Sequence, residues 1–425
     1  MPAYLNTATT SRFHTALADA RSELNLLDNP DRISFPLGTL EEAAAHFAAR
    51  EEFGYTYGRT GTPAGGVLER FLTTLEGGSA AVAVASGQAA NFLVFNALLP
   101  KAGDEIVASS RVFGGTSSLL SNWLPSIGRL ARFADPAVPE SFEKQVTENT
   151  RTIFVETISN PDGTVADLEA LAAIAQKHNI PLVVDNTLAT PLLCRPIEWG
   201  ANIVTSSLTK FFNGKGDLLA GAVIDAGNFN WKNDGRWPAL SNARPNGIAS
   251  LADAFNDKAF AAIVRQNLTL FGPSLNPADV AKLIDNAANL DKRLERHIDN
   301  ANQVAEYLIR HPSVEWVHYA GLDHHPSHQA ALKYLESPAA LLLFKPKGDD
   351  GIAGRLIQSL QHIRHEANIG FEETLVIHPF DTTHRLFSPE QKEAARIERG
   401  ALRLSIGTEN PEIIINDLNR AFALG

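Results

Sequence analysis

Three short polar segments of this chain each follow an apolar run, and together they could do chemistry. Ser86–Gln88 opens with a serine and a glycine, Asp185 follows two valines, and Ser206–Lys210 contains several hydroxyls and one amine. In open α/β sheets, ligands bind beyond the carboxyl ends of the strands, so polar residues directly after apolar runs are the first candidates. Each segment alone has an ordinary explanation, namely a turn, a helix cap or a solvated lysine. Their combination indicates a site.

The three segments supply the groups that pyridoxal phosphate requires. Lys210 can form the Schiff base, and the Asp185 carboxylate can keep the ring nitrogen protonated so that the ring acts as an electron sink. The N–H groups and hydroxyls of a strand-to-helix turn at Ser86–Gln88 can hold the phosphate. The sequence therefore predicts a pyridoxal-phosphate site.

Competing sites have weaker support. The chain contains neither Gly-x-x-x-x-Gly-Lys-Ser/Thr nor a Gly-x-Gly-x-x-Gly motif opening its first βα unit, so a nucleotide triphosphatase or a dinucleotide-dependent dehydrogenase has no fingerprint. Asp323, His324, His325 and His328 could bind a metal ion, but a solvated His-Pro loop explains the same cluster. We therefore expect no metal site.

An α/β domain must position these segments. Short runs that are apolar throughout predict strands covered on both faces, as in a mainly parallel sheet, at residues 81–85, 105–108, 152–156, 181–185, 203–206 and 219–224. Helical spacing predicts a crossover helix over 168–178 and a helix over 293–308, and Asn410 with Pro411 predicts the start of another. We divide the chain into an N-terminal arm (1–60), a large cofactor-binding α/β domain (61–262) and a C-terminal α+β domain (263–425).

Composition excludes several classes of protein. The 425 residues carry 37 Lys and Arg against 48 Asp and Glu, a net charge of −11, so general attraction to nucleic acid is not expected. Cys194 is the only cysteine, which rules out an intramolecular disulfide and suits a reducing compartment. The longest apolar runs, such as 339–344, are too short to span a bilayer. We expect a cytoplasmic protein without a membrane or nucleic-acid partner.

Six segments carry a family resemblance: 53–69, 82–90, 152–161, 183–200, 206–216 and 375–410. They resemble the Cys/Met-metabolism family of pyridoxal-phosphate enzymes, which includes cystathionine γ-synthases, cystathionine and methionine γ-lyases and O-acylhomoserine sulfhydrylases. Residues 185–191 and 194–200 look most similar to the O-acetylhomoserine sulfhydrylase branch. The resemblance implies the fold type I architecture of aspartate aminotransferase, with an arm that contacts another subunit, a large domain and a smaller C-terminal domain.

The resemblance also implies roles for particular residues around the cofactor. Lys210 would be the Schiff-base lysine and Asp185 the partner of the pyridine nitrogen, and Asn160 would lie near the ring hydroxyl. The residues that would hold the phosphate are Ser86, Gly87, Gln88, Ser207 and Thr209.

Further residues match the family's substrate and inter-subunit positions. Arg403 would bind the substrate carboxylate as a bidentate fork, with Asn368 contacting the same carboxylate. Tyr57 and Arg59 match a pair that reaches into a neighbouring subunit's phosphate site. Tyr57 is, in addition to Lys210, a candidate catalytic residue. This implies a homo-oligomer, with a dimer of dimers expected.

The chain departs from the family pattern at three places. Phe113 stands where the lyases usually have a tyrosine that stacks on the ring and assists the leaving group. Phenylalanine keeps the stacking but removes the proton donor, which favours a leaving group that departs without protonation, such as the carboxylate of an acyl ester. Residues 286–290 and 32–36 also differ from the usual motifs, and these differences bear on the substrate pocket and the subunit packing.

The expected activity is γ-replacement or γ-elimination on a γ-substituted amino acid. The preferred substrate is an O-acylhomoserine reacting with sulfide or a small thiol. The alternative is a γ-lyase acting on canavanine, methionine or cystathionine. A binding protein that kept only the fold is a second class, but retention of Lys210, Asp185 and Arg403 argues against it.

Overall fold

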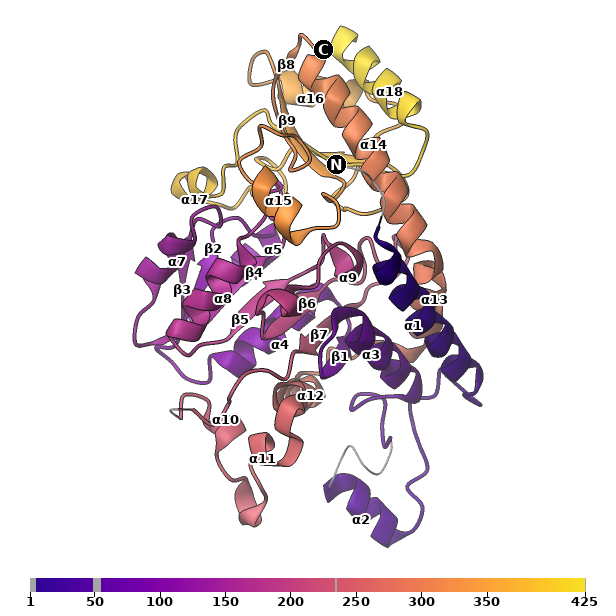
Figure 1. Ribbon diagram of the computed structural model, residues 1–425, viewed down its shortest axis with the longest axis vertical. Helices are drawn as coiled ribbons and strands as arrows, with labels where there is room; N and C mark the ends of the chain where they lie inside the picture. Colours follow the sequence, from indigo (N-terminus) through magenta and orange to yellow (C-terminus); the bar gives the residue numbers. More distant parts are fainter. Residues whose placement is uncertain (1–4, 49–54, 234, 425) are drawn as a thin grey trace.

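A seven-stranded sheet forms the centre of the molecule in the computed structural model, which describes residues 5–48, 55–233 and 235–424 (Figure 1). The strand order is β1-β7-β6-β5-β4-β2-β3, and only β7 runs antiparallel to its neighbours. The seven strands are β1 (Ala80–Val84), β2 (Glu105–Ser109), β3 (Leu130–Ala134), β4 (Thr150–Glu156), β5 (Leu182–Asp185), β6 (Ile203–Ser206) and β7 (Gly221–Asp225). The sheet is therefore mainly parallel, as expected from its apolar runs.

The six strands expected from the sequence are confirmed, with ends that differ by at most about two residues, within the usual uncertainty of such boundaries. Strand β3 was not expected. It lies at the sheet edge and most of its side chains are partly exposed, so it lacks the continuous apolar run of the inner strands. This partial exposure at the sheet edge explains why the strand was missed.

Two hydrophobic layers cover the two faces of this sheet. Ile153 and Val155 of β4 belong to one buried cluster, and Phe154 between them belongs to the other. This alternation is what the two-residue period of a strand dictates. Helices α3 (Pro63–Glu76) and α8 (Leu168–Lys177) pack in the first cluster, and α4 (Gly87–Leu98) and α12 (Ala259–Phe271) in the second. The crossover helix expected over 168–178 is therefore confirmed as α8.

A second, five-stranded sheet lies in the C-terminal part of the chain (Figure 1). Its order is β10-β11-β12-β9-β8, with antiparallel pairs except β10 and β11. The strands are β8 (Val314–His318), β9 (Leu341–Pro346), β10 (Arg364–His365), β11 (Leu375–Ile377) and β12 (Leu402–Ser405). Helices α14 (Leu290–Arg310), α16 (Ile352–Ser359) and α18 (Pro411–Leu424) pack together beside this sheet. The helix expected over 293–308 is confirmed within α14.

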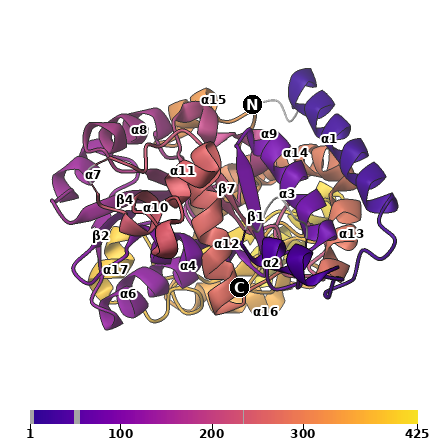
Figure 2. The same ribbon diagram turned by 90° about the horizontal axis from the view of Figure 1, so that it is seen from below.

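The start of α18 is also confirmed. Pro411 is its first residue, and the Asn410 side-chain oxygen accepts a hydrogen bond from the Glu412 backbone N–H at 3.0 Å. Figure 2, turned by 90°, shows α12 across the middle of the molecule, between α7 and α8 on one side and α1, α3 and α13 on the other. The remaining α-helices are α1 (Thr7–Asn25), α2 (Leu40–Ala48), α5 (Gly114–Ser118), α6 (Leu124–Ser126), α7 (Pro139–Gln145), α9 (Thr190–Leu193), α10 (Pro238–Ser241), α11 (Leu251–Phe255), α13 (Pro277–Asn286), α15 (His328–Tyr334) and α17 (Pro389–Ala394).

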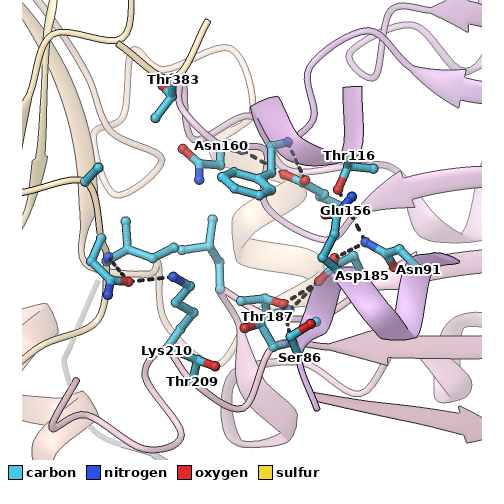
Figure 3. A pocket seen from close by; sticks show the side chains of 18 of the residues that line it. Ser86, Asn91, Thr116, Glu156, Asn160, Asp185, Thr187, Thr209, Lys210 and Thr383 are labelled. Atoms are coloured by element: carbon cyan, nitrogen blue, oxygen red, sulfur yellow. Dashed lines mark hydrogen bonds between the residues drawn. The ribbon is translucent and has the colours of Figure 1, made fainter. Parts of the chain in front are cut away.

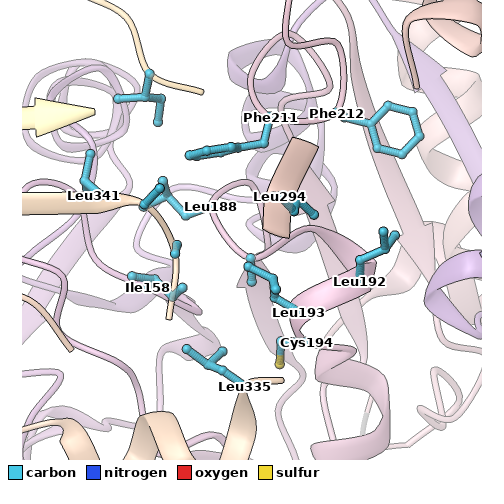
Figure 4. Packing of buried hydrophobic residues seen from close by; sticks show 14 of the residues in the cluster. Ile158, Leu188, Leu192, Leu193, Cys194, Phe211, Phe212, Leu294, Leu335 and Leu341 are labelled. Atoms are coloured by element: carbon cyan, nitrogen blue, oxygen red, sulfur yellow. The ribbon is translucent and has the colours of Figure 1, made fainter. Parts of the chain in front are cut away.

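One hydrophobic cluster joins the two sheets beside Lys210. Phe211 is completely buried and packs in the same cluster as Leu294 of α14 and Leu341 of β9 (Figure 4). Gly370 approaches Phe211 so closely that a Cβ atom there would lie 2.5 Å from the Phe211 backbone nitrogen. This packing fixes the backbone next to the lysine. None of the helices in the described residues is long and apolar enough to cross a bilayer.

Candidate active site

A cavity of about 200 Å³ lies where β4, β5 and β6 end and α4 begins (Figure 3). Nearly all of the residues expected to form the site line it, although they come from distant parts of the chain. These lining residues are Ser86, Gly87, Gln88, Phe113, Asn160, Asp185, Ser207, Thr209, Lys210, Asn368 and Arg403. The polar lining residues that sequence reasoning missed are Asn91, Thr116, Glu156, Thr187 and Thr383.

The first wall of the cavity is the N-terminus of α4. Ser86 caps the helix, because its side chain accepts a hydrogen bond from the Ala89 backbone N–H at 3.1 Å. Gly87 begins the helix, and a Cβ atom on it would lie 2.5 Å from the Ser207 Cβ atom. The two turns can pack this closely only because residue 87 has no side chain. The free N–H groups and the helix dipole make this wall suitable for an anion such as phosphate.

Two of the expected phosphate ligands are held by protein groups in this structure. The Thr209 hydroxyl donates to the Ala220 carbonyl at 3.2 Å and accepts from the Ala220 N–H at 3.0 Å. The Gln88 side-chain amide donates to the Gly115 carbonyl at 3.1 Å. A phosphate contact donated by the Thr209 hydroxyl therefore requires a change in its bond to Ala220, whereas the Gln88 amide has a second N–H group.

Asp185 is oriented by a network of hydrogen bonds. One carboxylate oxygen accepts from the Thr187 backbone N–H at 3.1 Å and from its hydroxyl at 2.5 Å, and the other accepts from the Asn91 amide at 3.2 Å. Burial raises the pKa of Asp185, and the bonds from Thr187 and Asn91 act in the opposite direction. Asp185 and Asn91 lie on one side of the cavity and Lys210 on another (Figure 3).

Lys210 follows β6 in the turn that also contains Thr209. Its amine donates to the Asn368 side-chain oxygen at 2.5 Å. Burial, with a smaller contribution from the Arg403 charge, lowers the pKa of Lys210 to about 8. A lysine with this pKa has a much larger neutral fraction near neutral pH than an exposed one, which is what a nucleophilic amine needs.

Arg403, on β12, is a buried guanidinium without a carboxylate partner among the residues that the structure describes. One terminal nitrogen donates to the Asn160 side-chain oxygen and the other to the Asn368 carbonyl, both at 2.9 Å. Its Nε atom is buried and has no hydrogen-bond partner. Burial lowers the pKa of Arg403 to about 9. Such an uncompensated cation is expected to attract an anionic group of a ligand.

Phe113 faces the cavity with 42% of its surface exposed. Its backbone N–H donates to one carboxylate oxygen of Glu156 at 2.6 Å, and the Asn160 N–H donates to the other at 3.0 Å. Burial, followed by repulsion from Asp185, raises the pKa of Glu156 well above its usual range. Glu156 ends the apolar strand β4, so the rule that found Asp185 could also have found it.

Tyr57 and Arg59 do not line this cavity. Tyr57 is 48% exposed, and the Arg59 guanidinium lies 5.7 Å from the centre of its ring and donates to the Thr269 carbonyl. Their expected role in a neighbouring subunit stays a prediction. Across the described ranges, no three His, Cys, Asp or Glu side chains are arranged to hold a metal ion.

Residues 35–423 match the family model described as Cys/Met metabolism PLP-dependent enzyme. The chain belongs to this family. It is 41% identical over 388 residues to O-acetyl-L-homoserine sulfhydrylase 1 of Thermus thermophilus, covering 90% of this chain and 91% of that protein. It is 38% identical over 377 residues to the homocysteine synthase of Schizosaccharomyces pombe, covering 87% of each.

Solved structures agree with this family membership. A putative O-acetylhomoserine (thiol)-lyase of Campylobacter jejuni superimposes with a TM-score of 0.92 at 33% identity, over 97% of this chain and 99% of that one. That protein was solved with N'-pyridoxyl-lysine-5'-monophosphate in the chain. Cystathionine γ-synthase of Xanthomonas oryzae superimposes with a TM-score of 0.83 at 27% identity, over 97% of this chain and 99% of that one. The fold type I assignment is therefore confirmed.

The residues of the cavity fit pyridoxal phosphate. Lys210 offers an amine whose pKa is lowered by burial, Asp185 offers an oriented carboxylate, and the N-terminus of α4 at Gly87 lines the cavity and suits an anion. The protein is thus a pyridoxal-phosphate-dependent enzyme by family and by the chemistry of its site.

Proposed function

We propose that this enzyme catalyses γ-replacement on an O-acylhomoserine, O-acetylhomoserine first, with sulfide as the nucleophile, releasing a carboxylate and forming homocysteine. The observation that carries the proposal is the buried, unpaired guanidinium of Arg403 beside Lys210, which suits an α-amino acid bound by its carboxylate. The names of its relatives, O-acetyl-L-homoserine sulfhydrylase and homocysteine synthase, support the choice of substrate.

Each residue has a defined task in this reaction. Pyridoxal phosphate, when bound, supplies an electron sink conjugated to the substrate Cα. Arg403 binds the substrate carboxylate and so orients the Cα–H bond toward the Lys210 amine. That amine, which is neutral in a larger fraction of molecules near neutral pH than an exposed lysine is, takes the Cα proton and assists removal of a Cβ proton. Asp185, which is held in place by Thr187, would keep a proton on the ring nitrogen of the bound cofactor.

Phe113 supports a leaving group that departs as an anion. Its ring offers an apolar face to the cavity and carries no hydroxyl that could protonate the γ-substituent. The carboxylate of an acyl ester leaves well without a proton, whereas a thiolate benefits from one. We therefore regard γ-lyase reactions on methionine and cystathionine as less favoured functions than γ-replacement on an acyl ester.

We include the subunit arrangement and the cellular compartment of the protein in the same proposal. Tyr57 and Arg59 lie outside the cavity, which is consistent with their completing the phosphate site of another copy in a homodimer or a dimer of dimers. One buried, free cysteine suits the cytoplasm. The arm (1–60), large domain (61–262) and C-terminal domain (263–425) remain our proposed division.

Product identification by mass spectrometry tests the activity. The cofactor-loaded enzyme is incubated with O-acetylhomoserine, O-succinylhomoserine, cystathionine, methionine or canavanine, each with and without sulfide. We expect sulfide-dependent homocysteine from an acyl ester. Release of 2-oxobutanoate or homoserine from methionine or canavanine, with both esters inert, would instead establish a γ-lyase.

A further inference from the structure

Glu156 is a buried carboxyl group that contacts two separate loops of the site. It ends β4, and its two oxygens accept hydrogen bonds from the backbone N–H groups of Phe113 and Asn160, at 2.6 and 3.0 Å. Phe113 follows β2, and Asn160 lies four residues beyond Glu156. One side chain therefore connects the loops after two neighbouring strands.

Each of these loops carries a group that faces the ligand. Phe113 lines the cavity, and the next residue, Gly114, packs so tightly against the Thr383 carbonyl that a Cβ atom would clash with it. Asn160 presents its side-chain oxygen to the Arg403 guanidinium at 2.9 Å. The two bonds to Glu156 thus hold the backbone of Phe113, which lines the cavity, and the backbone of Asn160, whose side chain contacts Arg403.

The free-energy cost of burying Glu156 indicates that its bonds to the Phe113 and Asn160 N–H groups have a structural role. Among the described residues, no lysine or arginine forms an ion pair with it, and Asp185 lies opposite it in the pairing of β4 with β5. Burying an unpaired carboxyl group beside another one is unfavourable, and a residue that only filled space here could be apolar. Two backbone N–H groups without an acceptor would also be costly.

We propose that Glu156 is a positioning residue, which fixes the Phe113 ring and, through Asn160, the direction of Arg403. The proposal rests on the proposed function only for the identity of the substrate carboxylate that Arg403 binds. It predicts that loss of Glu156 loosens both loops while the sheet that carries it stays intact.

The direct test is amide hydrogen exchange in the cofactor-free protein, with and without Glu156→Gln. Glutamine keeps the shape but has only one oxygen, so one of the two N–H groups loses its acceptor. We expect exchange to rise about tenfold in a peptide covering residues 110–118 or 157–166, the change expected for one hydrogen bond. Glu156→Ala should raise exchange in both peptides.

Glu105→Gln is the matched control. Glu105 is also a buried carboxyl group of the large sheet, on β2, but it binds Arg132 and Thr147 away from the cavity. We expect this variant to leave exchange in the two peptides unchanged. Unchanged exchange in Glu156→Gln, or an equal rise in Glu105→Gln, would overturn the proposal. These outcomes need no substrate, so they are independent of whether the proposed function is right.

Kinetics of the loaded enzyme separate positioning from general destabilisation. Glu156→Gln should raise KM for the amino-acid substrate about tenfold. In an Asn160→Ala background the same change should have little further effect on KM, because the link to Arg403 is already broken. Equal effects in both backgrounds would show that Glu156 does not act through Asn160. If Glu156→Ala does not fold, the isosteric Glu156→Gln alone decides between these outcomes.

Discussion

The two sides of the candidate active site are built in different ways. The cofactor side consists of Ser86–Gln88, Asp185 and the Ser207 turn, which follow strands of one sheet and are held by bonds within it. The substrate side depends on Arg403 and Asn368, which come from the C-terminal part of the chain. Within one copy of the chain, the cofactor side therefore comes from the large sheet, whereas the substrate side requires that the two sheets be correctly placed relative to each other.

Lys210 is where the two sides meet, because it follows β6 and its amine contacts Asn368. Replacement by alanine should therefore have the largest effect of any single change. We expect Lys210→Ala to lose covalent cofactor attachment and to lower kcat by about 10⁴-fold or more, since both the attachment point and the acid–base group are removed. Visible absorbance before and after borohydride treatment, together with product formation, measures both losses. Retained turnover would show that another residue performs these tasks.

Arg403→Gln tests the substrate side by itself. Loss of the bidentate guanidinium should raise KM for the amino-acid substrate at least about 100-fold, since two charge-assisted hydrogen bonds disappear. Cofactor affinity should change by less than about threefold if the two sides are separate. Arg132→Gln, which alters an arginine that binds Glu105 at a distance from the cavity, is the control. An equally large loss of cofactor affinity in Arg403→Gln would contradict the separation.

Gly87→Ala tests the cofactor side in the same way. The added methyl group would lie 2.5 Å from the Ser207 Cβ atom, so the two turns must move apart. Overpacking of this kind should weaken cofactor binding about tenfold in an equilibrium titration and leave substrate KM of the loaded enzyme nearly unchanged. Gly354→Ala, in α16, is the matched control because a Cβ atom there meets nothing within 4 Å. Equal weakening by both variants would mean that close packing at Gly87 is unimportant.

The same difference between the two sides explains what could be predicted from the sequence. Asp185 and Lys210 follow continuous apolar runs. Because ligands bind at the carboxyl ends of such strands, both residues could be identified without comparison with a known family. Arg403 and Asn368 come from short strands and loops of the second sheet, and only the family resemblance pointed to them. Asn91 lies inside α4 and meets Asp185 only after folding, so no local pattern marks it. Thr383 likewise reaches the cavity from a loop without a regular period.

The smallest expected effect is that of the Arg403 charge, on the substrate side, on the pKa of Lys210. Burial and, second, the positive charge of Arg403 lower the pKa of Lys210 from its ordinary 10.5 to about 8. Only the neutral amine attacks the cofactor aldehyde, so the rate of attachment to the cofactor-free protein should rise with pH, reach half of its maximum at about pH 8, and level off at higher pH. Stopped-flow absorbance over a range of pH measures this profile.

Arg403→Gln should shift that midpoint to higher pH, because removing a nearby positive charge makes the protonated amine more favourable. At pH 7 the variant should therefore attach the cofactor a few-fold more slowly, and at high pH the two rates should converge. Arg132→Gln should leave the midpoint unchanged. If Arg403→Gln also leaves it unchanged, the two sides are electrostatically independent and burial alone sets the reactivity of Lys210. If the midpoint lies near 10.5 in the unaltered protein, the amine is more hydrated than its buried position in the structure implies.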